Sequence, residues 1–422
     1  MLKTSFIISN KDEVIKLLSK RGFDANSMVN EIIALDKKRK SFQIQYEGVL
    51  AEINSISKTI GELFQSGEVS KAKPLKEKSS DLKKSSKDLA SDLEDCQKKI
   101  NSYLLQIPNL PHIDVPAGND EKDNKIIYES KISFNKNLVE PHWDLAKKYD
   151  IIDFELGTKI TGSGFPVYKG MGAKLQRALI SFFLDCNTDA GYEEVQIPHL
   201  VNENSAYGTG QLPDKEGQMY VVSSENLYLI PTAEVPITNI FRDVIISESD
   251  LPFMKTGYTP CFRREAGSYG SDVRGLNRLH QFDKVEIVKI EHPKESYNSL
   301  LKMKDHVEGI IKKLDLPYRI VTLCGGDLGF TSALTYDFEI FSPAQEKWLE
   351  VSSVSNFETF QSNRLKIRYR DNQGNIDLVH TLNGSALALP RVLAAILENN
   401  QSDDGIKIPK VLEKYTGFSI IK

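Results

Sequence analysis

The sequence predicts an α+β protein in which an antiparallel α-helical coiled-coil arm precedes a domain with a largely antiparallel β-sheet and flanking helices. Two patterns predict this fold. Apolar residues recur with a heptad period over residues 28–104, which is typical of paired helices. Beyond residue 120, β-branched and aromatic runs alternate with helical stretches, and several runs lie too close together for crossovers between parallel strands. The length of 422 residues also suits two domains.

The arm is predicted from two series of apolar positions. The first alternates steps of three and four residues, through Ile32, Leu35, Arg39, Phe42, Tyr46, Val49, Ile53, Ile56, Ile60 and Leu63. The stretch QSGEVSKA at 65–72 predicts a turn. The second series takes steps of seven, through Leu75, Leu82, Leu89, Cys96 and Tyr103. At about 1.5 Å per residue, the first helix is roughly 45–50 Å long between the ends of its seam.

The second helix of the arm is rich in lysine, with Lys71, Lys73, Lys76, Lys78, Lys83, Lys84, Lys87, Lys98 and Lys99. One interpretation is a dimerisation or spacer coiled coil whose lysines are simply solvated. The other is a lever that holds a large partner, because a basic strip on an otherwise acidic protein is a place where a phosphate backbone docks. The arm pattern alone leaves both open.

Three regions are expected along the chain. Residues 1–106 form an N-terminal domain with the arm at about 28–104, and the proline-rich segment IPNLPHIDVPAGND at 107–120 is a linker. Residues 121–422 form the second domain. Its strands are expected at YLI, VEIVKI, YRIVTL, YDFEIF and LKIRYR, and its helices at 171–190, at 296–314 and after Pro390.

Composition narrows the class of protein. The formal net charge of −4 shows no bulk basic character, so a nucleic-acid partner would need a local basic face. The four cysteines, Cys96, Cys186, Cys261 and Cys324, are far apart, which argues against zinc and disulfide frameworks and suits a reducing compartment. The start of the chain does not resemble a signal peptide, and no apolar run is long enough for a membrane helix. We therefore expect a cytoplasmic protein without a membrane partner.

The highest density of candidate functional side chains lies at residues 258–286, whose sequence is YTPCFRREAGSYGSDVRGLNRLHQFDKVE. Two strand-like ends flank a loop with Gly267, Gly270 and Gly275, and the four arginines within 16 residues are Arg263, Arg264, Arg274 and Arg278. Their planar forks suit phosphate oxygens, although the chain has neither of the common glycine-rich phosphate loops. At the period of a strand, Arg278, Phe282 and Glu286 are expected on one face. The alternatives are a solvated surface hairpin and, for Phe282, core packing.

This segment resembles motif 2 of the class II aminoacyl-tRNA synthetases, an F-R-x-E followed by a loop and R-x-x-x-F-x-x-x-E. The matching residues are Phe262, Arg263, Glu265, Arg278, Phe282 and Glu286. Within that class, TAEVP at 232–236, FRREAGS at 262–268, HQFDKVE at 280–286 and NGS at 383–385 resemble the seryl-tRNA synthetase family of bacterial type. The resemblance covers the whole chain, including the arm and the IPNLPH segment.

The resemblance implies an ATP site in which catalysis is mostly positioning and electrostatics. Arg263 is expected to bridge the α-phosphate and the serine carboxylate, Glu265 to accept from the adenine amino group, and Phe282 to stack on adenine. Arg278 and Arg391 are expected to contact the γ-phosphate. Arg263, Glu265 and Arg391 form the expected catalytic set, and the remaining ATP contacts are expected from Arg264, Glu350, Val351, Ser352 and Ser353.

The same resemblance implies a magnesium ion shared by Glu350 and Ser353, whose hard oxygen atoms suit Mg²⁺, and no zinc. A glutamate before a serine-rich run is otherwise more often a strand end. Around Arg391 the chain departs from the general class pattern, because Ala386 and Ala388 stand where many members carry glycine. That departure fits the seryl branch.

Serine selection is expected from Thr232, Ala233, Glu234, Arg263, Glu286 and Ser385. A buried carboxylate such as Glu286 pairs with the ammonium or hydroxyl group of serine, and alanine leaves that group unpaired. In a dry site this loss costs about 10⁴-fold in specificity.

Residues 172–201 resemble motif 1, a helix followed by GYEEVQIPHLV, with Gly191 and Pro198 at the matching positions. In the class this motif forms a two-fold dimer interface, so a homodimer is expected. The alternative is an ordinary amphipathic helix with an edge strand.

The implied activity is that of a serine–tRNA ligase. It converts L-serine and ATP to seryl-adenylate and pyrophosphate, then transfers serine to the 3′-terminal ribose of tRNA(Ser), which the helical arm holds. tRNA(Sec) stays open as a second substrate. Two alternatives remain: an amino acid ligase that charges a carrier protein, and a catalytically dead coiled-coil scaffold.

Overall fold

The fold is described from a computed structural model, which covers residues 1–132, 134, 138–214, 216–265 and 274–422. The chain divides into two compact units, which are treated separately below. One comprises Leu2–Ser19 and Phe23–Pro108, and the other comprises Met1, Lys20–Gly22 and Asn109–Lys422. Within the described residues, no helix combines the length and the apolar character that a membrane span requires.

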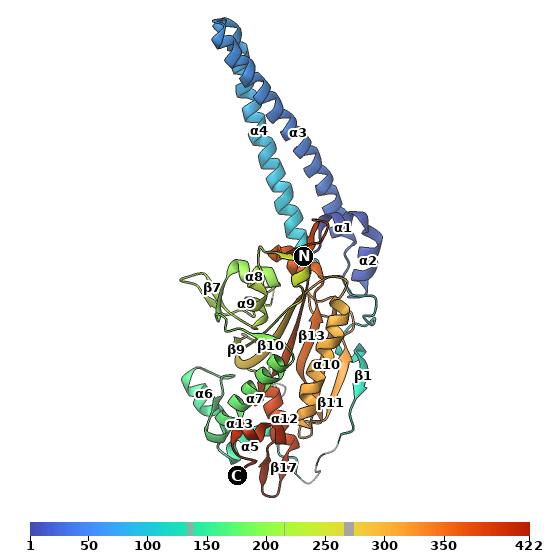
Figure 1. Cartoon of the computed structure of the whole chain (residues 1–422), viewed down its shortest axis with the longest axis vertical. Coiled ribbons are helices and arrows are strands. Elements are labelled where there is room, and N and C mark those ends of the chain that lie inside the picture. Colours follow the sequence, from blue (N-terminus) through green and yellow to red (C-terminus); the bar gives the residue numbers. More distant parts are fainter. Residues whose placement is uncertain (133, 135–137, 215, 266–273) are drawn as a thin grey trace. The chain divides into compact units, whose positions relative to one another are not determined.

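The smaller unit is helical, and its two long helices run antiparallel side by side (Figure 1). Its elements are α1 Thr4–Ser9, α2 Lys11–Ser19, α3 Asn26–Gln65 and α4 Val69–Leu104. The predicted seam is confirmed, because Ile32, Leu35 and Ile56 of α3 and Cys96 and Ile100 of α4 are buried. The predicted turn was too long, since α4 already begins at Val69.

Eight strands within the described residues form the main sheet of the larger unit, and every pairing is antiparallel except β4 with β9. This confirms the predicted fold class. In spatial order the strands are β1 Lys125–Glu129, β11 Tyr318–Thr322, β12 Leu334–Ser342, β13 Lys347–Asn356, β16 His380–Ala388, β10 Gln281–Glu291, β9 Phe253–Phe262 and β4 Glu193–Glu194.

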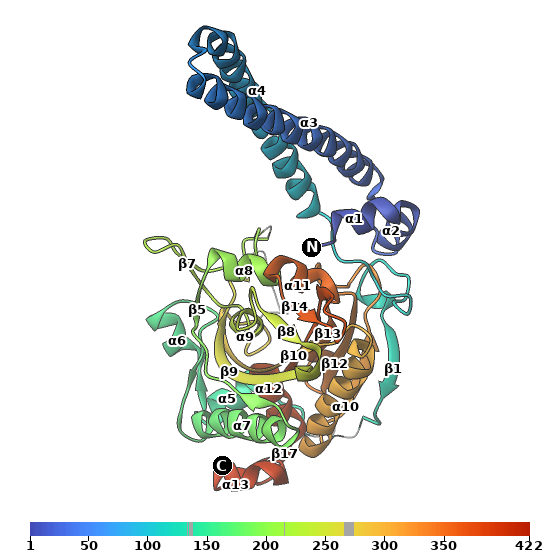
Figure 2. The same cartoon turned by 45° about the horizontal axis from the view of Figure 1, so that its top comes forward.

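Three helices cover one face of this sheet and form the core with it: α7 Gly170–Asp189, α10 Ser296–Leu314 and α12 Leu389–Asn399 (Figure 2). Phe183 of α7, Val307 of α10 and Leu393 of α12 are fully buried against strand residues such as Phe338 and Ile287. Helices α7 and α10 were predicted within about one residue of their bounds, and α12, which was expected after Pro390, begins at Leu389.

The opposite face carries α8 Glu203–Thr209, α9 Glu234–Asn239 and α11 Thr359–Leu365, which contact one another or β10 and β16. Other helices are α5 His142–Lys148, α6 Phe154–Ile160 and α13 Glu413–Thr416. Small sheets are formed by β2 Ile152–Asp153 with β3 Val167–Tyr168, by β5 Leu200–Asn202, β6 Val221–Val222 and β7 Leu227–Leu229, by β8 Ile245–Ser247, β14 Arg368–Arg370 and β15 Ile376–Leu378, and by β17 Gln401–Ser402, β18 Gly405–Lys407 and β19 Ile420–Ile421.

Two local expectations need comment. The run LKIRYR is a strand only over Arg368–Arg370, because buried Leu365 ends α11. In the segment expected as a linker, Asn109 is buried, and its side-chain amide donates to the carbonyl oxygens of Thr331 and Phe357, both at 2.9 Å. From Asn109 onward, that segment belongs to the larger unit.

Candidate active site

The predicted site residues lie on the sheet face opposite α7, α10 and α12. The two-residue period of the strands explains this placement. On β10, Val285 and Ile287 belong to the apolar core, so Lys284 and Glu286 lie on the other face. Adjacent β16 shows the same alternation and brings Ser385 opposite Glu286 in the register.

A cavity of about 480 Å³ on this face brings together most residues expected to bind serine: Thr232, Glu234, Arg263 and Ser385. Glu286 lies fully buried against it, and its Oε2 atom accepts a hydrogen bond from Thr232 Oγ1 at 3.1 Å. The Thr232 hydroxyl in turn accepts from the backbone N–H of Glu234 at 3.2 Å. We call this the amino-acid half of the site.

Three further predicted residues, one expected to bind serine and two expected to bind ATP, contribute little side-chain surface to the site. Ala233 is fully buried in a small apolar cluster with Ile197, Ile237 and Val288. Val351 is buried in the main core, although it also borders the neighbouring cavity. The Ser352 hydroxyl donates to the carbonyl oxygen of Ser385 beneath the strand surface. Their expected contacts would therefore come mainly from the backbone.

Two carboxylates stand close together in the amino-acid half, and they are compensated differently. Glu286 pairs with Lys284, with 2.5 Å between Nζ and Oε2. Glu234 receives neutral donors, among them Asn383 Nδ2 at 2.7 Å from Oε2. The same Asn383 nitrogen lies 3.1 Å from Glu286 Oε1. Burial, followed by the charge of Glu286, raises the pKa of Glu234 to about 7.

The nucleotide half adjoins this cavity and is built from the predicted ATP residues Arg263, Glu265, Phe282 and Arg391. The Arg263 guanidinium carbon lies 5.3 Å from the centroid of the Phe282 ring. Arg263 lines both cavities, so it stands where the two halves meet. An aromatic plate beside a guanidinium suits a nucleobase next to a phosphate.

The expectation that Arg278 lies on one strand face with Phe282 and Glu286 was wrong. β10 begins only at Gln281, and Arg278 lies in the bend before it. From that bend Arg278 reaches back to Glu265, with 3.3 Å between Nη1 and Oε2. Arg264 is exposed, and its backbone N–H donates to Gln218.

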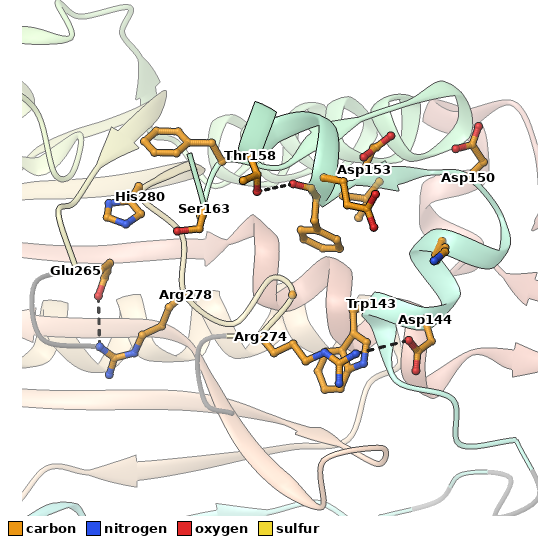
Figure 3. Close-up of a pocket in the computed structure, with 17 residues that line it drawn as sticks. Trp143, Asp144, Asp150, Asp153, Thr158, Ser163, Glu265, Arg274, Arg278 and His280 are labelled. Atoms are coloured by element: carbon orange, nitrogen blue, oxygen red, sulfur yellow. Dashed lines mark hydrogen bonds and ion pairs between the residues drawn. The ribbon is translucent and has the colours of Figure 1, made fainter. Parts of the chain in front are cut away.

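The Glu265–Arg278 pair also lines a third cavity, shown in Figure 3. On its far side, the Arg274 guanidinium carbon lies 4.6 Å from the ring centroid of Trp143. Carboxylates of Asp144, Asp150 and other residues line much of this cavity. This acidic character makes it a poor second site for phosphate groups.

Gly275 lies where the backbone of the loop before β10 passes close to the His142 imidazole. Its φ is +68°, and a Cβ atom there would lie 2.2 Å from His142 Nε2, so the position requires glycine. The neighbouring N–H of Leu276 donates to that imidazole nitrogen at 2.9 Å. The other two loop glycines of the motif, Gly267 and Gly270, lie outside the described residues.

Arg391 and Glu350 lie together at the far end of the nucleotide half. Arg391 Nη1 donates to the Glu350 carbonyl oxygen at 2.7 Å and lies 3.7 Å from Glu350 Oε2. Ser353 and Asp337 are partners in the register of β13 and β12, and they line the same groove as Glu350. Asp337 Oδ1 is buried without a hydrogen-bond partner. These hard oxygen atoms fit a magnesium ion.

Sequence reasoning missed several residues that the fold brings to the site: Lys284, Asp337, Gln361, Thr381 and Asn383. Asn383 stood in the quoted NGS motif without a role. Lys284 lies two residues before Glu286, and this spacing on a strand was the one local signal that would have found it. Gln361 gave no local signal, because it reaches the site from a helix 127 positions after Glu234.

Comparisons with known proteins agree with this geometry. The tRNA synthetase class II core domain (G, H, P, S and T) matches residues 220–400, and the seryl-tRNA synthetase N-terminal domain matches residues 1–111. A serine–tRNA ligase of Salinibacter ruber is 46% identical over 427 residues, which cover 100% of this chain and 99% of the relative. The chain belongs to the seryl-tRNA synthetase family.

Solved structures of the same family extend the match. The seryl-tRNA synthetase from Pyrococcus horikoshii complexed with ATP is 36% identical, with a TM-score of 0.92 over 100% of this chain and 99% of that one. The cytoplasmic serine–tRNA ligase from Naegleria fowleri in complex with AMP is 26% identical, with a TM-score of 0.87 over the same shares. These relatives give no support to the scaffold and carrier-protein alternatives.

Proposed function

We propose that this chain is a serine–tRNA ligase that makes seryl-adenylate from L-serine and ATP and then esterifies the 3′-terminal ribose of tRNA(Ser). One observation carries the proposal. Arg263 lines both a carboxylate-rich cavity of about 480 Å³ and a neighbouring cavity with an aromatic plate. The reaction requires this arrangement, because it joins an amino acid to the α-phosphate of a nucleotide.

In the first step, a serine carboxylate oxygen attacks the α-phosphorus, and the bond to the bridging oxygen of pyrophosphate breaks. Arg263 neutralises the charge that builds on the phosphoryl oxygens. Phe282 stacks on adenine, Glu265 accepts from its amino group, and Arg264 and the backbone of Val351 and Ser352 complete the contacts. Arg278 and Arg391 hold the leaving pyrophosphate end.

Glu350 and Ser353 would hold the magnesium ion that supports this step. When bound, the ion supplies a positive charge that neutralises phosphate oxygens. Arg391 lies next to Glu350, with 3.7 Å between Nη1 and Oε2. We assign no zinc to the chain, because its four cysteines are far apart in the sequence.

In the second step, the terminal ribose hydroxyl of the tRNA attacks the acyl carbon, and AMP leaves. Thr232, Glu234, Glu286 and Ser385 hold serine in both steps, together with Arg263 and the backbone of Ala233. Glu286 and Glu234 are buried, so they favour a substrate with an ammonium and a hydroxyl group over alanine.

We assign tRNA(Ser) to the arm, and tRNA(Sec) stays open as a second substrate. Residues 1–106 are the tRNA-binding domain, 107–120 its link, and 121–422 the catalytic domain. The lysines of α4 are exposed along the helix. Some already pair with acidic neighbours, such as Lys78 with Glu52 at 2.6 Å, and the others are available to phosphate groups.

We also propose a homodimer in the cytoplasm. The motif that resembles the class interface comprises α7 and the following segment, which leads to β4. Because β4 is the last strand of the main sheet, its outer edge suits association with a second copy. Unpaired cysteines suit the reducing cytoplasm.

The test is ATP–pyrophosphate exchange with each of the twenty amino acids, with and without bulk tRNA. The proposal predicts exchange with serine alone, and aminoacylation only when tRNA is added. Exchange with another amino acid would overturn the assignment of the pocket around Glu286. No exchange with any of them would overturn the proposed activity.

A further inference from the structure

Behind the amino-acid half, the side chain of Gln361 is almost completely buried, with 1% of its surface exposed. Its Nε2 atom donates to Glu234 Oε1 at 2.6 Å and to the Thr209 carbonyl oxygen at 3.2 Å. Its Oε1 atom accepts from the Thr381 hydroxyl at 2.7 Å. These three bonds fix the direction of the amide, because a flipped amide would place oxygen against the Glu234 carboxylate.

The charge around Glu234 is incompletely balanced. Its two oxygens receive hydrogen bonds from the neutral amides of Gln361 and Asn383. The charged groups that face it are Glu286 and Lys284 from β10 and Arg263 from the loop after β9. Lys284 is already in contact with Glu286, and the described residues supply no ion pair to Glu234. A buried carboxylate without a cation is costly.

We propose that Gln361 and Thr381 act as a positioning pair that holds Glu234 as an oriented, ionised acceptor for the ammonium group of the amino-acid substrate. The missing cation is then the substrate itself. This inference rests on the proposed function, and it adds which group of serine Glu234 receives and which two residues prepare it. Neither Gln361 nor Thr381 lines the cavity, so both act through Glu234.

The pair has a consequence for pH dependence. The pKa of Glu234 is raised to about 7, because burial and the charge of Glu286 outweigh the hydrogen bond from Gln361 and the charges of Lys284 and Arg263, which lower it. Removal of the Gln361 donor therefore raises the pKa of Glu234 further, and the carboxyl group stays protonated to a higher pH. A protonated, neutral Glu234 does not compensate an ammonium group. Serine binding in such a variant is weakened near neutral pH and recovers as the pH rises.

The experiment compares Gln361→Met, which keeps the side-chain length, with the wild-type enzyme in serine-dependent ATP–pyrophosphate exchange between about pH 6 and about pH 8.5. We expect the midpoint of the pH profile of kcat/KM for serine to move up by about one unit. We expect the serine KM near neutral pH to rise about tenfold, with the ATP KM unchanged within about twofold.

The Thr381 hydroxyl offers a second, milder variant with a matched control. Thr381→Val removes the donor that orients Gln361, whereas Thr381→Ser retains it. Thr381→Val should shift the pH profile in the same direction by a smaller amount, and Thr381→Ser should restore the wild-type profile. If Gln361→Met does not fold, the comparison of Thr381→Val with Thr381→Ser tests the inference in its place. Thr416→Val removes another buried hydroxyl, on α13, and controls for general destabilisation.

A rise in serine KM that is independent of pH would overturn the inference, because it would show only a packing role. An unshifted profile in both Gln361→Met and Thr381→Val would overturn it too. These outcomes differ from a failure of the proposed function, in which the wild-type enzyme itself shows no exchange with serine.

Discussion

The two halves of the site differ in how deeply their charged side chains are buried and in how closely these side chains contact other protein groups. In the amino-acid half, Glu286 is fully buried and Glu234 is 7% exposed, and both carboxylates hold several hydrogen bonds. In the nucleotide half, the side chains of Arg278 and Glu350 are 47% and 50% exposed and make longer contacts of 3.3 and 3.7 Å.

This difference fits two recognition tasks. Rejection of a close analogue of serine requires a dry, pre-built pocket whose polar groups suffer when they are unpaired. Binding of a triphosphate relies on cationic side chains that can exchange a neighbouring carboxylate for a phosphate as their partner. Substitutions in the first half should therefore act on serine, and those in the second half should act on ATP.

Removal of Arg263 should have the largest effect, because this residue belongs to both halves. Arg263→Ala is expected to lower kcat for pyrophosphate exchange by at least about 10³-fold, since it removes charge stabilisation at the reacting phosphate. Arg370→Ala, at the exposed end of β14, is the matched control and should retain exchange. Exchange by Arg263→Ala near the wild-type rate, in a folded protein, would remove the link between the halves.

Shortening the arm should impair the charging of tRNA and leave the formation of the adenylate, which uses both halves of the site, unchanged. Replacement of residues 50–84 by a short glycine–serine link keeps the buried base of α3 and α4, including Ile32 and Ile100. Charging of tRNA should fall by about 10²-fold or more, with serine-dependent exchange intact. The removal of residues 30–102 is the harsher version. Equal loss of both activities would make the arm structural.

Glu286→Gln tests the amino-acid half alone. We expect kcat/KM for serine to fall by about 10²-fold, because a buried charge-assisted network around Thr232, Lys284 and Asn383 loses its acceptor charge. The ATP KM should change by less than about threefold. An equal loss for both substrates would mean that the two halves are not separate.

Phe282→Leu tests the nucleotide half and should have the smallest effect. Loss of the stacking surface should raise the ATP KM by about tenfold, with the serine KM unchanged within about twofold. The wild-type ring lies beside Arg263, and leucine retains packing there. A change confined to serine would contradict the adenine assignment.

Features with a local period were predictable from the sequence. The seam of the arm follows a heptad repeat, so Ile32, Leu35 and Cys96 were found before their burial was known. Strands β10, β11 and β12 and helices α7, α10 and α12 follow from apolar patterns of two and 3.6 residues. The family resemblance likewise implied that Arg263, Glu286 and Arg391 share one site.

Features that depend on contacts distant in sequence were not predictable. The position of Arg278 was wrong because a strand period was extended past the bend where β10 begins. Gln361 and Thr381 gave no signal, since their role exists only where α11 and β16 meet behind α9. Long-range hydrogen bonds of this kind leave no periodic trace in a single sequence.

The most direct test of the two-half site is a crystal structure of the chain with a stable seryl-adenylate mimic that carries a sulfamoyl group in place of the phosphate. We expect the serine ammonium and hydroxyl groups within hydrogen-bonding distance of Glu234 and Glu286, the sulfamoyl group at Arg263, and adenine on Phe282. A serine moiety found elsewhere, such as the cavity beside Trp143 and Arg274, would contradict it.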